Sequence, residues 1–435
     1  MTSHAVPLRE SLATHRPLRV VPGLLVIAAV CFNAGLAVVN GNITSLGPAL
    51  VIAAEMALVL AAHAVALANY RPQMLPWYLL GAALLVVACW RSMALQQFDP
   101  KYFRDVLIIP TFVVLGMTFD RRSLNRVVVI VHAVVMITLV FEILATDAYS
   151  AVFKVKEYYI NTRGYDVQSF WNKNSDLFVN AVRPDSRLFS FLDLHRVSSV
   201  FLEPVSLGSY CIVIIAFICA RYEELSRTQV LFLVGGTLIA MLGSDSRLAA
   251  MSSVLIVAIT VMGRRLLPRS VALVYLPVVL AVAFLYVTIG GIPAGSDDFP
   301  GRIAHTVHLL SRFSVDEFLG ISSDPILLSE SVDSGIGYLV LTQSIFGVTL
   351  IWGAIVLASA NRSSDQVRYV HAVCVYLSLT MIVSFAFLSI KTASLLWFVY
   401  GVLQLPQRPQ AKPDLRSVTR SAAAHPLRRR AALVS

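Results

Sequence analysis

Charged side chains are scarce in this sequence. Asp, Glu, Lys and Arg make up 14% of its 435 residues, whereas 57% are hydrophobic, and the mean hydropathy is +0.73. A typical soluble domain has about 25% charged residues, and one soluble core cannot bury this much apolar surface. The composition excludes a soluble globular protein and predicts an all-α polytopic membrane protein, with residues 1–435 as a single integral membrane domain.

Cysteine and metal-ligand patterns are also sparse. The five cysteines all lie within apolar runs, so the sequence predicts neither a disulfide nor a thiolate metal site. His305 and His308 are three residues apart, but the sequence shows no third metal ligand nearby. The simpler interpretation is that both lie on the surface of a helix. We therefore expect no metal and no cofactor.

The net charge of +10 does not indicate a nucleic-acid partner. The basic residues lie between apolar stretches. In the basic tail, residues 407–435, no aromatic residues alternate with the basic ones. Such a tail is more simply a cytoplasmic segment that faces anionic membrane lipids.

Long uncharged stretches predict the membrane spans. A span needs about 20 apolar residues, and shorter helices are acceptable where neighbours bury them. Arginines concentrate in the short connections and the tail, which places both termini in the cytoplasm. The twelve predicted transmembrane helices lie near residues 20–40, 46–68, 74–91, 105–119, 124–145, 202–220, 228–244, 247–263, 271–291, 335–358, 369–390 and 392–406.

This topology sends two long loops to the outside, residues 146–201 and 292–334. In the first, aromatic residues mix with asparagines and both charge signs, which suits either sugar binding or an interfacial aromatic belt. In the second, Ile303, Val307 and Leu310 form one apolar face, which predicts an amphipathic helix lying on the membrane. Arg302 on that helix could face lipid head groups or a substrate.

Several charges fall where outer loops enter helices. Arg196 and Glu203 precede the uncharged stretch that begins at Pro204, a residue tolerated in the first turn of a helix. Arg247 follows a very short connection, and an arginine near the membrane costs a few kcal/mol unless it is paired or solvated. Its partner could be the nearby Asp245, or its guanidinium could hold a phosphate.

Asp333, in the C-terminal third of the chain, directly precedes an uncharged stretch that begins at Ser334. Either residue would make a good helix N-cap, so a structural role is open for both.

The order of several short motifs along the chain resembles that of the O-antigen ligase and polymerase superfamily. Within it, the chain is most similar to the repeat-unit polymerases of the xanthan type. The resemblance covers residues from about 190 to 360. It rests on an Arg-x-x-Ser-x-Phe-x-x-Pro stretch (residues 196–204), a Ser-x-Ser-Arg turn (244–247), a large outer loop, an Asp-Ser-Gly-x-x-Tyr segment (333–338) and the pair Phe346-Gly347.

The resemblance implies a GT-C-like membrane glycosyltransferase of the bacterial inner membrane. Its substrates would be lipid-linked oligosaccharide pyrophosphates on an undecaprenyl carrier, and its chemistry would be metal-independent. Arg196 and Arg247 would correspond to the family's paired arginines, which stabilise charge on the pyrophosphate, with Arg302 or Arg312 as a third cation. The family's ligases carry a histidine where this sequence has Asp333, which favours a polymerase.

Three points stay open in the sequence. The catalytic base could be Asp333 or Glu203. The partners include membrane lipids, and the sequence leaves open whether a chain-length regulator and export machinery are further partners. The chain could instead be a lipid-linked oligosaccharide flippase or a proton-coupled transporter that uses Glu55 and Glu142 at the membrane midplane. These two carboxylates could also pair across helices or face a lipid-access groove.

Overall fold

The protein is described by a computed structural model that covers residues 20–405, except residues 98, 171–174, 183–194, 263–266, 294, 296–297 and 359–362. The N-terminal 19 residues and the predicted basic tail lie outside the described part. All secondary structure in the described part is helical. This bears out an all-α chain, as expected where water cannot satisfy backbone polar groups.

Each of the twelve predicted ranges contains a helix. Pro204 does begin its helix, α9. The first predicted span is a pair of helices with a 62° bend between them. The helices are α1 Val21–Val30 with α2 Phe32–Asn42, α3 Pro48–Ala68, α4 Leu75–Leu95, α5 Pro100–Thr118, α6 Leu124–Leu144, α9 Pro204–Arg221, α10 Arg227–Ser244, α11 Arg247–Met262, α12 Tyr275–Gly290, α16 Gly335–Leu357, α17 Ser364–Val383 and α18 Ile390–Leu403.

In the described part, eight helices are long and apolar enough to cross a membrane, or nine if the bent pair counts as one span. The protein is therefore a multi-pass membrane protein. Helices α11 and α18 are shorter, and α5 carries Lys101, Arg104 and Asp105 near its start. The number twelve thus stays a prediction.

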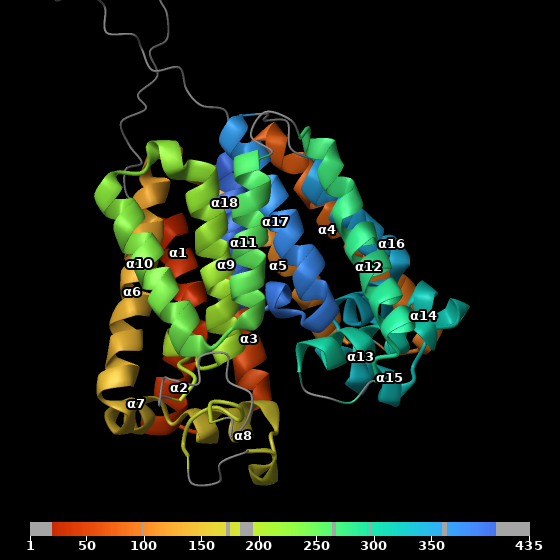
Figure 1. Ribbon diagram of the computed structural model, residues 1–435, viewed down its shortest axis with the longest axis horizontal. Coiled ribbons are helices and arrows are strands. Elements are labelled where there is room, and N and C mark those ends of the chain that lie inside the picture. Colours follow the sequence, from red (N-terminus) through yellow and green to blue (C-terminus); the bar gives the residue numbers. More distant parts are fainter. Residues whose placement is uncertain are drawn as a thin grey trace, which may run out of the picture. The chain divides into compact units, whose positions relative to one another are not determined.

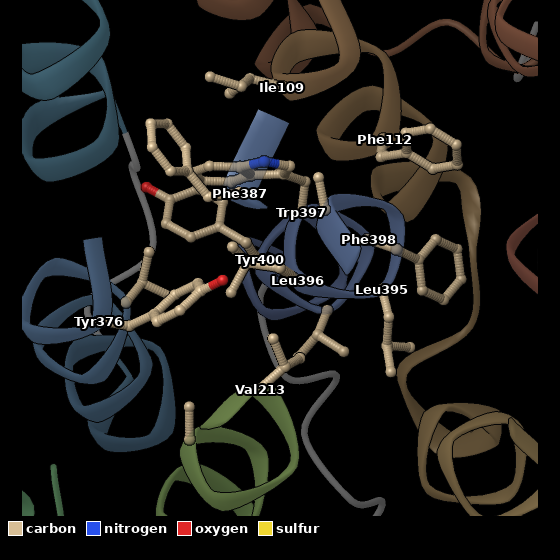
Figure 2. Packing of buried hydrophobic residues seen from close by; sticks show 14 of the residues in the cluster. Ile109, Phe112, Val213, Tyr376, Phe387, Leu395, Leu396, Trp397, Phe398 and Tyr400 are labelled. Atoms are coloured by element: carbon tan, nitrogen blue, oxygen red, sulfur yellow. The ribbon is translucent and has the colours of Figure 1, made fainter. Parts of the chain in front are cut away.

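Helix α18 lies at the centre of the hydrophobic core. All fourteen of its residues are buried, and an all-round apolar helix is one that neighbouring helices surround. Figure 2 shows Trp397 and Tyr400 of α18 beside Ile109 of α5, Val213 of α9 and Tyr376 of α17. At about 1.5 Å per residue, α18 is shorter than the hydrocarbon thickness of a bilayer, so burial explains how so short a helix is accommodated.

Other helices turn large apolar side chains outward. Lipid contact requires such a surface, because lipid tails are as apolar as leucine. The exposed residues include Leu60 on α3, Val86 on α4, Ile137 on α6, Leu231 on α10 and Val282 on α12.

Both predicted long loops contain short helices. The first loop holds α7 (Thr146–Phe153), α8 (Val155–Arg163) and the 3-10 turns η4 (Val167–Ser169) and η5 (Ser199–Phe201). The second holds α13 (Phe299–Ser311), α14 (Val315–Leu319), α15 (Pro325–Glu330) and the 3-10 turn η9 (Ser331–Asp333). Helices α7 and α8, and likewise α13 to α15, are drawn in the lower part of Figure 1.

The aromatic residues of the first loop mostly face inward. Tyr149, Tyr158 and Tyr159 are buried in a small cluster with Leu177 and Leu202. These three form neither the sugar-binding surface nor the interfacial belt that the sequence suggested, because they pack against Ala37 of α2 and Phe141 of α6. Trp171, which shared that prediction, lies outside the described residues.

The amphipathic helix of the second loop forms as α13, but its surroundings differ from the prediction. Ala304 and Val307 pack against Val287 of α12 and Ile382 of α17, and the Thr306 hydroxyl donates to the Ile382 carbonyl. Protein rather than the membrane surface covers the apolar face. The sequence pattern revealed the face but could not say what covers it.

Candidate functional site

The six predicted site residues all lie at one end of the helices. We call it the outer end, after the orientation that the arginine distribution predicts. There the outer connections meet the helices. Arg196 and Glu203 precede α9, Arg247 begins α11, Arg302 lies in α13, Arg312 follows α13 and Asp333 precedes α16.

Direct contacts join the Arg196 segment to the turn that carries Arg247. The Arg196 Nε donates to the Ser244 carbonyl at 3.0 Å, and the Val197 N–H donates to the Gly243 carbonyl at 3.0 Å. Arg196 is buried, with 7% of its surface exposed. Arg247 follows Ser244 by three residues, so these bonds bring the segments of both predicted phosphate ligands together.

The buried carboxylate of Glu142 holds the Arg196 segment from the opposite side. It accepts hydrogen bonds from the backbone N–H groups of Ser198 (2.9 Å) and Ser199 (2.6 Å) and from the Ser198 hydroxyl, and it contacts His195 Nε2 at 3.2 Å. Ser199 has a left-handed backbone, with φ of 53°. Glu142 therefore fixes the conformation of the backbone beside Arg196, and its partners lie in the outer connection rather than in another spanning helix.

Glu203 forms an ion pair that the sequence analysis did not anticipate. Its Oε2 lies 2.7 Å from Lys391 Nζ, and it also accepts hydrogen bonds from Tyr159 (2.6 Å) and Ser206 (2.7 Å). Burial alone would raise the pKa of Glu203, but the ammonium of Lys391 and the hydrogen bonds from Lys391 and Tyr159 outweigh it and lower the pKa to about 2. A carboxylate so strongly paired is a poor proton acceptor.

Lys391 also fixes the end of the Arg196 segment. Its Nζ donates to the Phe201 carbonyl at 3.1 Å, next to Leu202, which has a positive φ of 61°. The one sequence signal for this role was a lone lysine within an apolar stretch, since such residues normally have a functional or pairing reason to be there.

Asp333 has a different environment. About 65% of its side chain is exposed, and it lies 3.7 Å from Arg302 Nη1. Ser334 provides the N-cap of α16 by accepting from the Gly337 N–H at 3.2 Å, so Asp333 is not needed for that role. Burial raises the pKa of Tyr165, and the charges of Glu203 and Asp333 raise it further.

The two remaining arginines differ in their surroundings. Ile303, next to Arg302, and Leu248, next to Arg247, pack against the same small cluster of buried apolar residues, so α13 and the start of α11 border one cluster. Arg312 is half-exposed and pairs with Glu330 at 2.5 Å. The structure thus joins the segments of Arg196 and Arg247 and pairs Arg302 with Asp333, while Glu330 already neutralises Arg312.

A second buried charge cluster lies at the outer end. Arg104 of α5 pairs with Glu55 of α3 at 2.9 Å and with Asp105 at 2.6 Å. The Tyr338 hydroxyl of α16 donates to Asp105 at 2.6 Å. Glu55 therefore pairs across helices, one of the roles that the sequence left open for it.

The contact between α9 and the Arg247 turn depends on Gly208. A Cβ atom at this position would lie 2.2 Å from Ser246 Oγ, whereas a Cβ at Gly235 of α10 would meet nothing within 4 Å. We expect Gly208→Ala to push the turn away from α9 and to cost about 1–3 kcal/mol, the usual range for overpacking. Thermal unfolding in detergent should show a lower midpoint for Gly208→Ala than for Gly235→Ala. Equal midpoints would contradict the close approach.

Comparison with protein-family models, with curated proteins and with solved structures finds no match. Among the residues that the structure describes, no group of three or more His, Cys, Asp or Glu side chains is placed to hold a metal ion. The function is therefore inferred from the site residues themselves.

Proposed function

We propose that this protein is a membrane glycosyltransferase that polymerises lipid-linked oligosaccharide repeat units into an exopolysaccharide of the xanthan type. It would have a GT-C-like architecture with twelve spans and act on the outer face of the bacterial inner membrane. The observation that carries the proposal is the bond between Arg196 and the Ser244 carbonyl, in the turn that leads to Arg247. This bond joins the two segments that carry the arginines, and a pair of guanidinium groups suits a pyrophosphate, because each can donate two hydrogen bonds to one phosphate.

The reaction needs few groups. A sugar hydroxyl of the incoming repeat unit attacks the anomeric carbon of the growing chain. A carbon–oxygen bond forms there while the bond to the pyrophosphate oxygen breaks, and the lipid pyrophosphate leaves with the electron pair. Arg196 and Arg247 stabilise the negative charge that develops on it. A single displacement from the opposite face inverts the anomeric carbon.

Asp333 is the base in this proposal. It receives the proton of the attacking hydroxyl, because its side chain is largely exposed and its contact with Arg302 is loose, at 3.7 Å. Glu203 is the weaker candidate, since Lys391, Tyr159 and Ser206 already occupy its oxygens. Glu203 instead supports the segment that carries Arg196.

The contacts of two other carboxylates favour an enzyme over a proton-coupled transporter. Glu142 accepts hydrogen bonds from two backbone N–H groups, and Glu55 pairs with Arg104. A carboxylate that takes up and releases protons during transport would have to break these contacts in each cycle.

The test uses purified protein and synthetic lipid-linked repeat units in detergent without divalent metal. The wild type should yield multimers in the chain-length profile. Asp333→Asn should be slower by about 10²–10⁴-fold, the usual contribution of a general base, and should unfold at the wild-type temperature. Asp324→Asn is the matched control, because Asp324 caps α15 and asparagine caps equally well.

Two results would count against this function. The first is a wild type that leaves single repeats under every condition, with or without added metal. The second is an Asp333→Asn variant that elongates chains as fast as Asp324→Asn, which would remove Asp333 from the chemistry.

A further inference from the structure

Arg91 of α4 is a buried arginine with an unusual environment. Only 8% of its surface is exposed, and its guanidinium carbon lies 4.8 Å from the centroid of the Tyr102 ring. It forms no hydrogen bond or ion pair with any residue that the structure describes, and its Nε is buried without a partner. Burying a cation without an anion is costly. The position therefore suits a negatively charged ligand.

Lys101 of α5 adds a second positive charge beside the same ring. Its Nζ lies 5.8 Å from the centroid of Tyr102 and 5.5 Å from that of Tyr338. The carboxylate of Asp99 accepts from the Lys101 backbone N–H at 2.9 Å, so it offsets part of the charge. Neither cation forms an ion pair within the described residues, because Arg104 already binds the nearby Glu55 and Asp105.

Helix α16 contributes polar groups at the same place. Its backbone breaks at Ser344, which has a φ of 61° and a ψ of 167°, a conformation that costs a non-glycine residue about 1–3 kcal/mol. Gln343 donates to the Tyr102 carbonyl at 2.9 Å, while its own Oε1 is buried without a partner. Broken membrane helices commonly expose such groups to a ligand. An unused acceptor suits a sugar hydroxyl.

The surroundings point to a ligand that arrives from the bilayer. On α4, Trp90 and Met93 are exposed beside the inward-facing Arg91, and on α16 Phe346 is exposed close to Gln343. These apolar residues suit the hydrocarbon chain of a lipid. The two cations suit its phosphate, because a phosphate accepts several charge-assisted hydrogen bonds.

We propose that Arg91 and Lys101 bind the phosphate of a second lipid-linked saccharide, the acceptor, while Arg196 and Arg247 bind the donor pyrophosphate. This assignment rests on the proposed function, because polymerisation requires two lipid-linked substrates at once. The donor loses its lipid pyrophosphate, whereas the acceptor keeps its own, so two separate phosphate sites are needed.

The position of Tyr338 connects this second site to the proposed base. Its ring faces Lys101, and its backbone N–H donates to the Ser334 carbonyl at 2.8 Å, one helical turn from Asp333. In this proposal, the saccharide of an acceptor held at Arg91 and Lys101 extends along the first turn of α16 toward Asp333.

The experiment measures how many lipid-linked repeat units bind to the full chain in nanodiscs, by native mass spectrometry. The wild type should bind two and Arg91→Gln/Lys101→Gln one. The charge-matched control Arg122→Gln, at the opposite end of the helices, should bind two. Arg91→Lys keeps the positive charge and should retain most of the second binding. Thermal unfolding checks that each variant is folded.

A kinetic measurement separates the two sites. With a preformed chain as donor and a labelled single repeat as acceptor, Arg91→Gln/Lys101→Gln should raise the KM for the acceptor by at least about 10-fold and leave the KM for the donor unchanged.

The outcomes are distinguishable. Two bound saccharides in the folded double variant would overturn the assignment. So would a double variant that loses bound phosphatidylglycerol but keeps both saccharides, because the site would then hold a bulk lipid head group. If the wild type makes no polymer but the double variant still loses one of two bound saccharides, the polymerase proposal fails while the phosphate site stands.

Discussion

Replacing Arg247 by alanine is expected to slow chain elongation by about 10²–10³-fold, which corresponds to about 2.7–4 kcal/mol of transition-state stabilisation. The reason is electrostatic. The leaving pyrophosphate gains negative charge as the glycosidic bond breaks, and a guanidinium placed beside it acts where charge develops. Arg247 begins α11 and is only partly buried, so its loss should leave the fold intact.

The measurement is the elongation rate with synthetic lipid-linked repeats, together with the thermal unfolding midpoint. Arg227→Ala is the control, because Arg227 begins α10 at the opposite end of the helices and is exposed. It should elongate chains at the wild-type rate. Equal rates for Arg247→Ala and Arg227→Ala would show that Arg247 does not contact the pyrophosphate.

Arg196→Ala should behave differently although it serves the same phosphate group. Arg196 is buried and bonds to the Ser244 carbonyl, so its removal also releases the turn of Arg247. A lower unfolding temperature should therefore accompany the loss of activity. The effects of the double variant should be less than additive, because residues that act as a unit give non-additive losses.

The helices of this protein were largely predictable from the sequence, because long uncharged stretches have few alternatives in a membrane. The start of α9 at Pro204 followed from the same reasoning. Whether α18 crosses the membrane is harder to predict, because all of its residues are buried by other helices and it need not match the thickness of the bilayer.

The sequence placed Arg196, Arg247 and Asp333 at the same end but could not separate the two candidate bases. That distinction depends on partners. Glu203 meets Lys391 from the last helix and Tyr159 from the first outer loop, and no local pattern reveals contacts between such distant segments. The same reason explains why Glu142 was ambiguous, since its donors Ser198 and Ser199 come from another part of the chain.

Strained backbone was equally hidden from sequence reasoning. Ser199, Leu202 and Ser344 have positive φ values without being glycine, and no residue preference predicts this. Two of them lie in the Arg196 segment and the third in the break of α16. Such strain persists where surrounding contacts determine it, and it concentrates at functional sites.

The Glu203–Lys391 pair should produce the largest stability change. In Lys391→Met the partly buried carboxylate of Glu203 loses its counter-ion, and removing one partner of a buried ion pair costs about 3–5 kcal/mol. We expect the lower part of that range, because 22% of the Glu203 side chain is exposed. The unfolding midpoint in detergent should fall clearly.

The double variant Lys391→Met/Glu203→Gln should recover much of this stability, because a neutral amide needs no counter-ion and its oxygen still accepts from Tyr159 and Ser206. Elongation should recover less than stability does, since the Phe201 carbonyl still lacks the bond from Lys391 that steadies the Arg196 segment. A double variant as unstable as Lys391→Met would mean that Lys391 stabilises the fold through packing rather than through its charge.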